Sequence, residues 1–374
     1  MFDLYSGNTP SRLNKEHFKG TVNWISSGEL KEHYIYSSKE QISEEAAKSL
    51  KLLPVGTFVI AIYGLEAEGV RGTGSITQEP STISQACMSF IQKGEIGNEF
   101  LYSWYKKHGN VIGIRYAQGT KQQNLSYDIL EKFRIVYPKT KEQEKLNKLI
   151  SLLDERISTQ NKIIEDLKKL KSAIIENVFD DKHSERLQLD NVGSYIRGLT
   201  YSSNDVVEHG GTLVMRSNNI VNGSLLDYNN NVVFVNKQMS AEQQLQNGDI
   251  VICMANGSSS LVGKSSFYDG NWHSPITVGA FCGIYRSKEP IVKWLFQTNK
   301  YRRYIWNSLQ GGNGAIANLN GEDILNMSFS IPNAPIKDTC VKMLTSVDSA
   351  LENNISLCAL YTLQKQHLLR QMFI

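Results

Sequence analysis

The fold is decided by a stretch that occurs twice, Asn124-Leu125-Ser126-Tyr127-Asp128-Ile129-Leu130 and Asn318-Leu319-Asn320-Gly321-Glu322-Asp323-Ile324-Leu325. A proline follows each copy, at Pro138 and Pro332, and a long helical run then ends at Phe179 and at Phe373. The two prolines and the two phenylalanines are each 194 residues apart. Solenoid repeats have periods of only roughly 20–50 residues. The sequence therefore predicts two similar halves, each a globular part followed by a long helix.

The repeat predicts four segments. We expect globular parts at 1–140 and 181–334, and long helices at 141–180 and 335–374. The globular parts are rich in short strands and turns, which indicates a mixed α/β (α+β) fold with a pseudo-two-fold internal repeat. A length of 374 residues suits two or more domains.

Two further anchors match between the halves. Residues 53–60 parallel residues 245–252, and in each a turn glycine leads into an apolar strand. Phe100-Leu101-Tyr102 parallels Trp294-Leu295-Phe296 on an expected helix. Between these anchors the sequences diverge, as expected when a shared framework carries two different ligands or when duplicated halves have simply drifted.

Composition narrows the class of protein. Hydrophobic residues make up 41% and charged residues 21%, and the formal net charge is only +3. This mild charge neither indicates nor excludes nucleic acid, because a local patch matters more than the total. The five cysteines are dispersed and no stretch has the length of a membrane span, so we expect a cytoplasmic protein without a metal site.

The first long run has the apolar periodicity of a paired helix. It contains neither glycine nor proline, and at about 1.5 Å per residue it is a rod of roughly 58 Å. With Leu146 at heptad position a, Leu149, Ile163 and Leu170 fall at position d. Position e is also largely apolar, so we expect a buried stripe wider than a minimal coiled-coil seam. Such a stripe requires a partner, and the second run supplies one in the same chain. We expect the two helices to form an antiparallel coiled coil.

Two amides occupy equivalent a positions in the predicted helices. Gln160 and Asn354 both lie near the middle of a helix, and the middles meet in an antiparallel pair. We expect the two amides to face each other, because a polar layer fixes helix register. The alternative is that each amide simply tolerates a partly exposed position.

Basic and aromatic residues cluster at equivalent places. Lys106-Lys107-His108 lies in the first half and residues 300–304, Lys-Tyr-Arg-Arg-Tyr, in the second. A polar, glycine-containing segment follows each cluster, at 118–124 and at 310–314. Such residues bind phosphates and read base edges. One copy alone is most simply a solvated helix face, but the recurrence favours nucleic-acid binding.

The chain shows no convincing catalytic motif. Residues 256–265 resemble a phosphate-binding loop, but five residues separate Gly257 from Gly263 where a P-loop has four. We expect instead a mobile loop whose Lys264 and Ser265 face a polyanion. The scattered histidines form no zinc-protease motif, and no hydrolase elbow is present.

A family resemblance rests on these features together. Residues 6–11, Ser-Gly-Asn-Thr-Pro-Ser, open the first domain; residues 119–125, Asp128, Pro138 and Glu142-Gln143 follow, and a long helix closes on Phe179. This pattern resembles the specificity subunits of type I restriction–modification systems. The second half repeats it and ends, like that family, on residues 368–374. It departs at Lys337-Asp338, which stand where the first copy has Glu142-Gln143.

The resemblance implies a division of labour. Each globular part would be a target-recognition domain that reads one half of a bipartite, asymmetric sequence in double-stranded DNA. The helices would set the spacer and dock two methyltransferase subunits, and restriction translocase–endonuclease subunits would join for cleavage. S-adenosylmethionine, and ATP with magnesium, would be bound by those partners, so this chain would carry no cofactor and no catalytic residue.

The expected DNA contacts are polar and basic residues of both halves. In the first half they are Ser27, Arg71, Lys106, Lys107, Lys121, Gln122 and Gln123. In the second half they are Arg216, Asn218, Asn219, Lys264, Ser265, Lys300, Arg302, Arg303 and Asn313. Lys106 and Arg302 are assigned to phosphates, and base reading is assigned to Arg71, Gln122, Arg216 and Asn218.

Three alternatives remain open. The chain is a similar subunit of a system whose methylation and cleavage activities share one partner chain, a helical-ruler adaptor that holds two proteins, or an enzyme that uses residues 257–265 to bind a nucleotide. The salt dependence of binding distinguishes the adaptor from a DNA-binding subunit, because affinity for DNA falls steeply with ionic strength. Loss of nucleotide binding in Lys264→Ala would mark the third.

Overall fold

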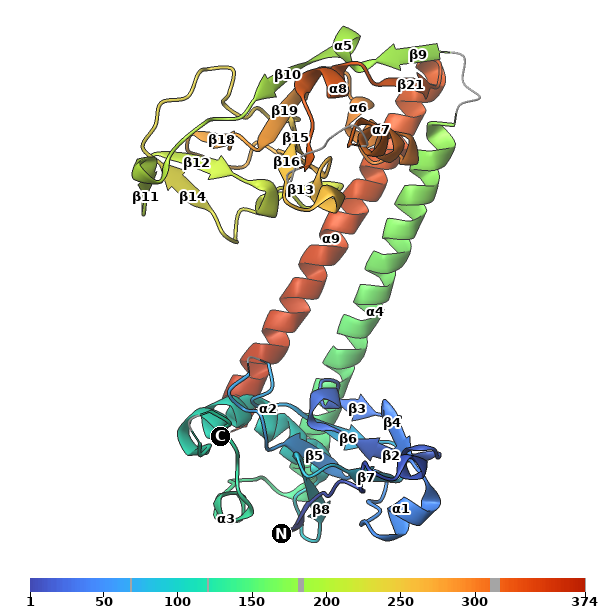
Figure 1. The fold of residues 1–374 in the computed structure, drawn as a ribbon, viewed down its shortest axis with the longest axis vertical. Coiled ribbons are helices and arrows are strands. Elements are labelled where there is room, and N and C mark those ends of the chain that lie inside the picture. The colour runs from blue at the N-terminus through green and yellow to red at the C-terminus, as the bar shows by residue number, and fades with distance from the viewer. Residues whose placement is uncertain (68, 120, 181–184, 310–316, 374) are drawn as a thin grey trace. The chain divides into compact units, whose positions relative to one another are not determined.

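The computed structural model describes residues 1–67, 69–119, 121–180, 185–309 and 317–373 (Figure 1). They form two compact units. Unit 1 comprises Met1–Asn161 and Ser356–Ile374, and unit 2 comprises Lys162–Ile355. The long helices α4 (Thr140–Val178) and α9 (Ala334–Met372) each contribute one half to either unit. The expected helices at 141–180 and 335–374 are therefore present, but each compact unit includes two half-helices.

Unit 1 is built on two sheets. The larger has the order β1-β8-β5-β6-β3 and consists of β1 (Phe2–Ser6), β8 (Cys87–Gln92), β5 (Phe58–Ala61), β6 (Gly74–Thr77) and β3 (Tyr34–Ile35). The smaller has the order β4-β2-β7 and consists of β4 (Glu40–Ile42), β2 (Val22–Ile25) and β7 (Ser81–Ile83). Helix α2 (Asn98–Tyr116) packs on β5 and β6, and the short helices α1 (Glu44–Lys48) and α3 (Tyr127–Leu130) complete the unit.

Unit 2 repeats this strand order. Its five-stranded sheet runs β10-β19-β15-β17-β13, with β10 (Gly193–Arg197), β19 (Cys282–Ser287), β15 (Ile250–Cys253), β17 (Ser265–Phe267) and β13 (Ser224–Leu225). The second sheet runs β11-β14-β12-β18, with β11 (Val206–Val207), β14 (Val233–Val235), β12 (Thr212–Met215) and β18 (Ile276–Val278). In both units the last strand of the small sheet pairs in parallel with its neighbour. The predicted mixed α/β internal repeat is confirmed at the level of topology.

Unit 2 also has elements that differ in detail from those of unit 1. Two helices, α6 (Val292–Leu295) and α7 (Asn299–Leu309), stand where unit 1 has α2, and α8 (Gly321–Leu325) corresponds to α3. A short two-stranded pairing joins β16 (Ala255–Asn256) to β20 (Ala317–Asn318). Another joins β9 (Glu185–Gln188) to β21 (Ser328–Ile331), and helix α5 (Leu189–Val192) links β9 to β10.

The sequence anchors fall at equivalent places in the two sheets. Leu53 and Leu245 are buried, and Gly56 and Gly248 have φ of 81° and 91° in the turns that lead into β5 and β15. A φ in this range favours glycine. Phe100 and Trp294 are buried on α2 and α6. The two anchor predictions are confirmed.

A second pair of glycines permits a close approach of backbone to backbone. A Cβ on Gly7 would lie 2.1 Å from the carbonyl oxygen of Ile83, and one on Gly198 would lie 2.2 Å from that of Gly279. Each glycine donates its N–H to a carbonyl of the next strand, Gly7 to Cys87 and Gly198 to Cys282, both at 3.2 Å. Larger residues therefore do not fit at either turn.

The buried stripe of the long helices differs from the predicted one. On α4 the expected d positions Leu149, Ile163 and Leu170 are 38–49% exposed. The stripe instead follows a and e, through Leu146, Ile150, Leu153 and Ile157. On α9 it follows Cys340, Leu344, Val347 and Leu351, while Met343 and Leu357 are exposed. Burial at positions a and e agrees with the wide stripe that we expected, whereas the predicted burial at position d was wrong. Spacings of 4 and 3 residues suit a helix seam as well as spacings of 3 and 4 do.

The two long helices pair antiparallel within each unit. In unit 1 the guanidinium of Arg156 lies 5.8 Å from the ring centroid of Tyr361, Lys365 forms an ion pair with Asp154, and the thiol of Cys358 donates to Asn161 at 3.3 Å. Residue number thus rises along α4 as it falls along α9. In unit 2, Lys171 of α4 pairs with Asp348 of α9 at 2.7 Å. Gln160 and Asn354 belong to different units, so their pairing stays a prediction.

Membrane insertion has no support in the helices of the described residues. Although α4 and α9 are long, neither they nor any other described helix is apolar enough to cross a bilayer.

Candidate nucleic-acid interface

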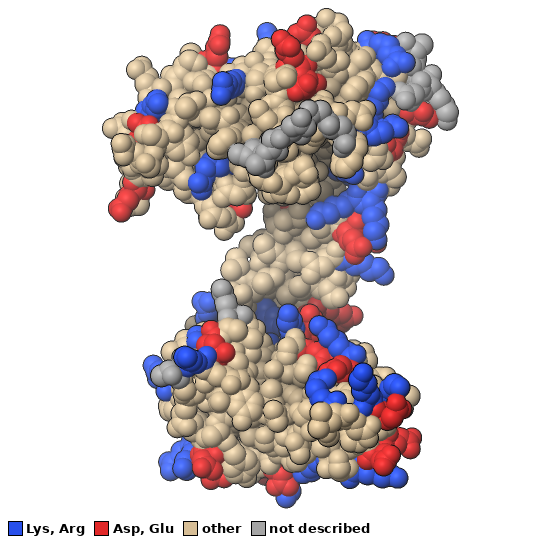
Figure 2. All heavy atoms as spheres, in the orientation of Figure 1, with Lys and Arg blue, Asp and Glu red and all other residues tan. Residues whose placement is uncertain are grey.

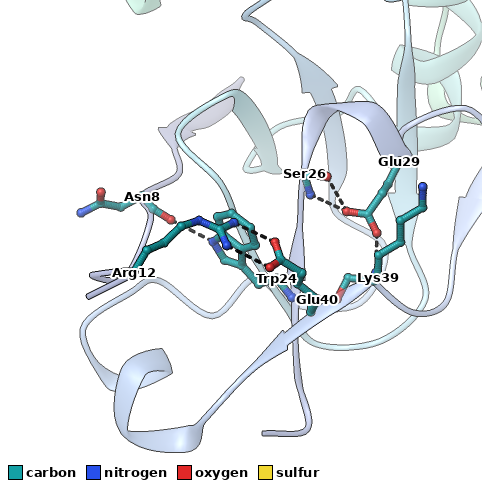
Figure 3. Close-up of polar contacts among 8 residues, drawn as sticks. Asn8, Arg12, Trp24, Ser26, Glu29, Lys39 and Glu40 are labelled. Atoms are coloured by element: carbon teal, nitrogen blue, oxygen red, sulfur yellow. Dashed lines mark hydrogen bonds and ion pairs between the residues drawn. The ribbon is translucent and has the colours of Figure 1, made fainter. Parts of the chain in front are cut away.

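A capped turn follows the central strand of the smaller sheet in unit 1. It is the 3-10 turn η2 (Ser27–Glu29), shown in Figure 3. The Glu29 carboxylate accepts hydrogen bonds from Ser26 N–H at 2.9 Å, from Ser26 O–H at 2.6 Å and from Lys39 N–H at 2.5 Å. These bonds fix the turn. Ser27, which is half-buried, and Gly28, which is exposed, lie at its tip.

Neighbouring side chains hold residues 7–12, which begin with the turn glycine Gly7, against the same sheet. The Trp24 indole N–H donates to the carbonyl oxygen of Asn8 at 3.0 Å (Figure 3). Arg12 forms a bidentate ion pair with Glu40, at 2.9 and 2.7 Å, and its guanidinium lies 4.5 Å from the ring centroid of Phe18. Residues 7–12 and the η2 turn are thereby positioned by one small sheet.

Unit 2 has a turn of the same geometry with different side chains. After β12 comes η4 (Ser217–Asn219), in which Asn219 takes the place of Glu29. The Asn219 side-chain oxygen accepts from Arg216 N–H at 2.9 Å, and its amide donates to the carbonyls of Asp227 and Asn230. Asn218 is exposed at the tip. The turn is thus repeated, but its outward residues change from Ser-Gly to Ser-Asn.

Arg216 and Asn218 line a hollow of about 440 Å³ beside this turn. Tyr201 and Phe281 line its other walls, and Phe281 is 65% exposed. One Arg216 amino group donates to the carbonyl oxygen of Asn231 at 2.9 Å, which orients the guanidinium. The hollow therefore combines the guanidinium of Arg216, the exposed amide of Asn218 and the exposed ring of Phe281. Groups of these kinds form hydrogen bonds with base edges and stack on bases.

A second hollow in unit 2, of about 250 Å³, brings together Lys264 and Arg302. Ser259 and Ser260 of the turn η5 (Ser259–Leu261) line it, together with Trp306, which is 64% exposed. The Tyr301 hydroxyl donates to the carbonyl oxygen of Gly263 at 2.8 Å and joins α7 to the loop. Two cations with hydroxyls and an exposed ring suit a phosphate and its sugar.

The polar segment of unit 1 is held by Arg71. Its guanidinium donates to the Gln123 side chain at 3.2 Å, and the Glu66 carboxylate accepts from Gln123 N–H at 2.8 Å. Lys121 and Gln122 are exposed beside them. Four of the expected contacts of the first half therefore come together, although Arg71 and Gln123 are partly occupied with each other.

The Lys106-Lys107-His108 cluster is tied to the helix ends. Lys107 Nζ donates to the carbonyl oxygens of Arg370 at 2.7 Å and Phe373 at 2.5 Å, at the end of α9. Lys106 lies 5.4 Å from the Tyr102 ring centroid, and burial, together with the charge of Lys365, lowers its pKa. A cation at a helix C-terminus stabilises the helix. Lys107 therefore has a structural role here, which the solvated-face reading did not foresee.

The remaining expected contacts divide by exposure. Arg302 and Arg303 are exposed on α7, and Lys300 is half-buried at its start. Asn219 and Ser265 are fully buried. Ser265 lies in β17, so it does not face a polyanion as expected, because the loop after Gly257 leads into a buried strand. Asn313 and the segment at 310–314 lie outside the described residues.

Aromatic residues of the two hollows were missed by the sequence reasoning. Tyr201 stands in a polar stretch, but Phe281 follows Ala280 within an apolar run and Trp306 follows Ile305. Only Tyr201 therefore offered a local signal, because a large side chain in a polar loop is exposed unless another segment covers it. Exposed aromatic rings mark interaction surfaces.

Charges of both signs are distributed over both units. On the face that Figure 2 shows, lysine and arginine alternate with aspartate and glutamate, in line with the net charge of +3. Within the described part of the chain no three histidine, cysteine, aspartate or glutamate side chains are placed to hold a metal ion. The residue set of the turns and hollows therefore suits recognition of a polyanion by directed contacts.

The first half of the chain matches the model of a known protein family. Residues 1–169 match the model of the type I restriction modification DNA specificity domain. The match covers less than half of the chain, and it shows that the first half is similar to this domain. Unit 2 repeats the strand order of unit 1, in which most of these residues lie.

Two specificity subunits show the extent of sequence similarity. The chain is 29% identical over 185 residues to the Type I restriction enzyme MjaIX specificity subunit of Methanocaldococcus jannaschii; the match covers 48% of this chain and 42% of the relative. It is 35% identical over 155 residues to the EcoKI specificity subunit of Escherichia coli, covering 39% and 31%. The matches thus span less than half the length of these curated relatives.

Solved structures share the fold over the whole chain. The type I S subunit from M. genitalium superposes with a TM-score of 0.62 at 15% identity, covering 100% of this chain and 94% of that one. A chain from a structure on complex assembly and conformational transition of the type I restriction–modification system gives a TM-score of 0.56 at 12% identity, covering 99% and 97%. The likeness establishes a fold of two mixed α/β domains with long helices.

Proposed function

We propose that this chain is the DNA-reading specificity subunit of a type I restriction–modification complex. The observation that carries the proposal is the repeated capped turn, η2 in unit 1 and η4 in unit 2. Turn η2 follows β2 and turn η4 follows β12, the equivalent strands of the two smaller sheets, yet the turns present different side chains. Two turns with the same backbone geometry and different tip residues allow a protein to read two different short sequences in the same way. The match of residues 1–169 to the type I specificity domain supports the same function.

The two half-sites of the target should then differ. Unit 2 offers Arg216 and Asn218 beside Phe281, whereas the equivalent turn of unit 1 offers Ser27 and Gly28. Arginine pairs best with guanine and asparagine with adenine in the major groove. In unit 1 base reading falls to Gln122 and Arg71 of the neighbouring segment. We therefore propose an asymmetric, bipartite target, with Lys264, Arg302 and Lys106 near phosphates.

The long helices would serve as spacer and as docking site for two methyltransferase subunits. Large apolar side chains remain exposed along them, namely Leu149, Leu152, Ile163, Leu170, Ile355, Leu357, Leu360 and Leu363. Exposed apolar residues gathered on two helices indicate protein contacts. We propose that the antiparallel pairing seen in each unit continues between them as one coiled coil, with Gln160 and Asn354 facing each other at its middle.

Catalysis would belong to the partners in this arrangement. The chain would read DNA in the cytoplasm, methyltransferase subunits would bind S-adenosylmethionine and methylate adenine, and translocase–endonuclease subunits would use ATP and magnesium. The modest net charge agrees with shared phosphate contacts, because partners that enclose the DNA can supply the rest.

Selection of bound DNA from a random library tests the proposal. The purified chain, alone and with candidate methyltransferase subunits, is incubated with random duplexes, and the bound fraction is sequenced. A bipartite motif with a constant spacer, weakened steeply by salt, is expected. An enriched pool without a motif, at every salt concentration, would refute the DNA-reading role.

A second function has a specific observation in its favour. The exposed leucines of α4 and α9 also suit an adaptor that holds two proteins without DNA. Salt separates the two, because apolar docking does not weaken as ionic strength rises, whereas DNA binding does. Protein complexes that form with unchanged affinity at high salt, in a chain that selects no DNA motif, would favour the adaptor.

A further inference from the structure

Three successive asparagines form an exposed loop in unit 2. Asn229, Asn230 and Asn231 lie between β13 and β14, and all three are exposed. The equivalent loop of unit 1 lies between β3 and β4, is shorter, and consists of residues 36–39, Tyr-Ser-Ser-Lys. The loops connect equivalent strands, because β3 and β13 end the larger sheets and β4 and β14 pair antiparallel with β2 and β12. The asparagine run therefore distinguishes unit 2 from unit 1.

The loop is held in one conformation by bonds within it. The Asp227 carboxylate accepts hydrogen bonds from Asn229 N–H at 2.9 Å and from the Asn230 side-chain amide at 2.7 Å. Asn231 has a φ of 52°, and in the part of the chain that the structure describes no other non-glycine residue has a positive φ. Asparagine tolerates this left-handed region better than most residues, and such a conformation persists where the surrounding structure enforces it. The loop therefore presents its exposed side chains from a defined backbone.

The loop is also fastened to the capped turn η4. The Asn219 side-chain amide donates to the carbonyl oxygens of Asp227 at 3.1 Å and Asn230 at 2.7 Å. The Asp227 N–H donates to the carbonyl oxygen of Asn219 at 2.9 Å, and an Arg216 amino group donates to that of Asn231 at 2.9 Å. The turn and the loop thus form one rigid edge. Asn219 is fully buried and holds this edge together, so it has a positioning role that needs no contact with DNA.

Unit 1 fastens its shorter loop in the same way but exposes different side chains. Glu29 occupies the place of Asn219 in η2, and its carboxylate accepts from Lys39 N–H at 2.5 Å. Tyr36 and Lys39 are the large exposed residues of that loop. The connection between turn and loop is therefore repeated, while the exposed residues differ. The tips of η2 and η4 show the same relation.

The exposed asparagines keep unused hydrogen-bonding groups. No hydrogen bond joins the side chain of Asn229 or Asn231 to another residue in the described ranges. The loop is supported on its other side by Tyr228, which stacks on Trp272 with ring centroids 5.8 Å apart and donates its hydroxyl to Asp269 at 3.3 Å. An asparagine amide offers a donor and an acceptor side by side, and adenine presents the complementary pair in the major groove. Fixed, exposed amides therefore suit the reading of adenine.

We propose that the loop Asp227–Asn231 is a second base-reading element of unit 2, in which the Asn229 and Asn231 amides contact adenines beside the base pair that Arg216 reads. The inference rests on the proposed DNA-reading function and extends it, because it assigns A·T pairs to residues outside the set expected from the sequence. The bond from Arg216 to the loop backbone keeps the three side chains on one edge. The bases that they contact are therefore neighbours in one half-site.

Two substitutions in the full-length chain remove the amides one at a time. Asn229→Ala removes the first. Asn231→Gly removes the second and keeps the backbone conformation, because glycine adopts a positive φ freely. The matched control is Asn236→Ala, at an exposed asparagine that follows β14 and lies outside both the loop and the hollow.

Each protein, with candidate methyltransferase subunits, selects duplexes from a random library at several salt concentrations. We expect each loop variant to lose the preference for an A·T pair at one position of the unit 2 half-site, by about tenfold in enrichment. Arg216→Ala, selected in parallel, should act at a neighbouring position. The dependence of affinity on salt should not change in the loop variants, because an amide carries no charge.

Two references show that a change belongs to the loop. Asn236→Ala should select the wild-type motif. The half-site of unit 1 should stay unchanged in every variant, which shows that the proteins are folded and bind DNA.

The possible failures are distinguishable. Unchanged base preference in both loop variants would overturn the inference and leave the proposed function standing. A weaker salt dependence without a change in preference would mark a phosphate contact and would overturn it too. Loss of preference for a G·C pair would refute the assignment to adenine. A wild-type chain that selects no motif would overturn the proposed function together with the inference.

Discussion

The two units share a strand order but differ in how the long helices are tied to each sheet domain. In unit 2, Lys171 and Asp348 form an ion pair with side chains only 8% and 9% exposed, and Lys293 and Trp294 also bond to the Asp348 carboxylate at 2.9 and 3.1 Å. The equivalent pair in unit 1 joins Lys365 to Asp154, with side chains 22% and 31% exposed.

This comparison shows which contacts the repeat preserves. Asp154 and Asp348 are 194 residues apart, as are Lys171 and Lys365, so the same pair recurs with its partners exchanged between helices. Position 293 is a lysine bound to the pair, whereas its counterpart Glu99 accepts from His33 and Tyr34. The helix-to-helix contact is constant, and its surroundings have diverged.

The largest effect is expected from neutralising Asp348. Asp348→Asn should destabilise the chain by about 3–5 kcal/mol, because Lys171 remains buried beside Lys293 without a compensating charge. The matched change Asp154→Asn should cost about 1 kcal/mol or less, because the side chains of Lys365 and Asp154 are 22% and 31% exposed. Chemical denaturation of both variants measures the difference, and equal losses would contradict the comparison.

The same buried carboxyl makes stability depend on pH. Burial opposes ionisation of Asp348, but Lys171 and Lys293 beside it lower its pKa below the usual 3.8. The unfolded chain therefore binds the proton more readily than the folded one. The contribution is complete above pH 3.8 and is lost as pH falls through the lowered pKa. Wild type should lose stability more steeply than Asp348→Asn in this range; parallel curves would show that the carboxyl does not titrate differently on folding.

The second comparison is between a buried and an exposed leucine. Leu189→Ala in unit 2 should cost about 2–5 kcal/mol, because it empties part of a fully packed core. Leu52→Ala, at a leucine that is more than half exposed, serves as a control and should change stability by less than about 0.5 kcal/mol. A loss below about 1 kcal/mol for Leu189→Ala would mean that this leucine contributes little to unit 2.

The third comparison concerns the two capped turns. Arg216→Ala should weaken binding by about 1–3 kcal/mol and relax base preference in one half-site only. Substituting the tip residue of unit 1, Ser27→Ala, should affect the other half-site. Selection from libraries randomised in each half separately measures the two effects. Equal relaxation of both half-sites by Arg216→Ala would contradict its assignment to one turn.

The smallest effect is expected at the second hollow of unit 2. Lys264→Ala should weaken binding to all sequences alike and reduce the slope of log affinity against log salt by about one. Lys288→Ala, at an exposed lysine outside that hollow, is the matched control and should leave affinity and salt slope unchanged. A change in sequence preference in Lys264→Ala, with the salt slope unchanged, would place this residue at a base.

Sequence alone predicted the repeat well because its signals are local. The turn glycines Gly56 and Gly248 require an unusual φ, and the prolines mark the start of each long helix. The helix register was harder to predict: Leu149 and Ile150 are both apolar, and only the partner helix decides which is buried. Offsets between equivalent positions range from 190, for Ser27 and Ser217, to 195, for Phe90 and Tyr285, because the loops differ in length.

The candidate site was predicted only in part. The sequence singles out Arg216 and Asn218, and in the structure both line one hollow, while their contact with DNA stays a prediction. Asn219 and Ser265 look equally suitable in the sequence, but long-range contacts bury them. Phe281 and Trp306 were missed because their exposure depends on segments far away in the chain.

A genome-wide map of methylated adenine tests the central claim most directly. The map is made in cells that express candidate methyltransferase partner genes, with wild-type chain, without the chain and with Arg216→Ala. The account predicts methylation at one bipartite, asymmetric motif that disappears without the chain and that loses definition in a single half with Arg216→Ala. The same methylation pattern with and without the chain, in cells where partner and chain co-purify, would contradict it.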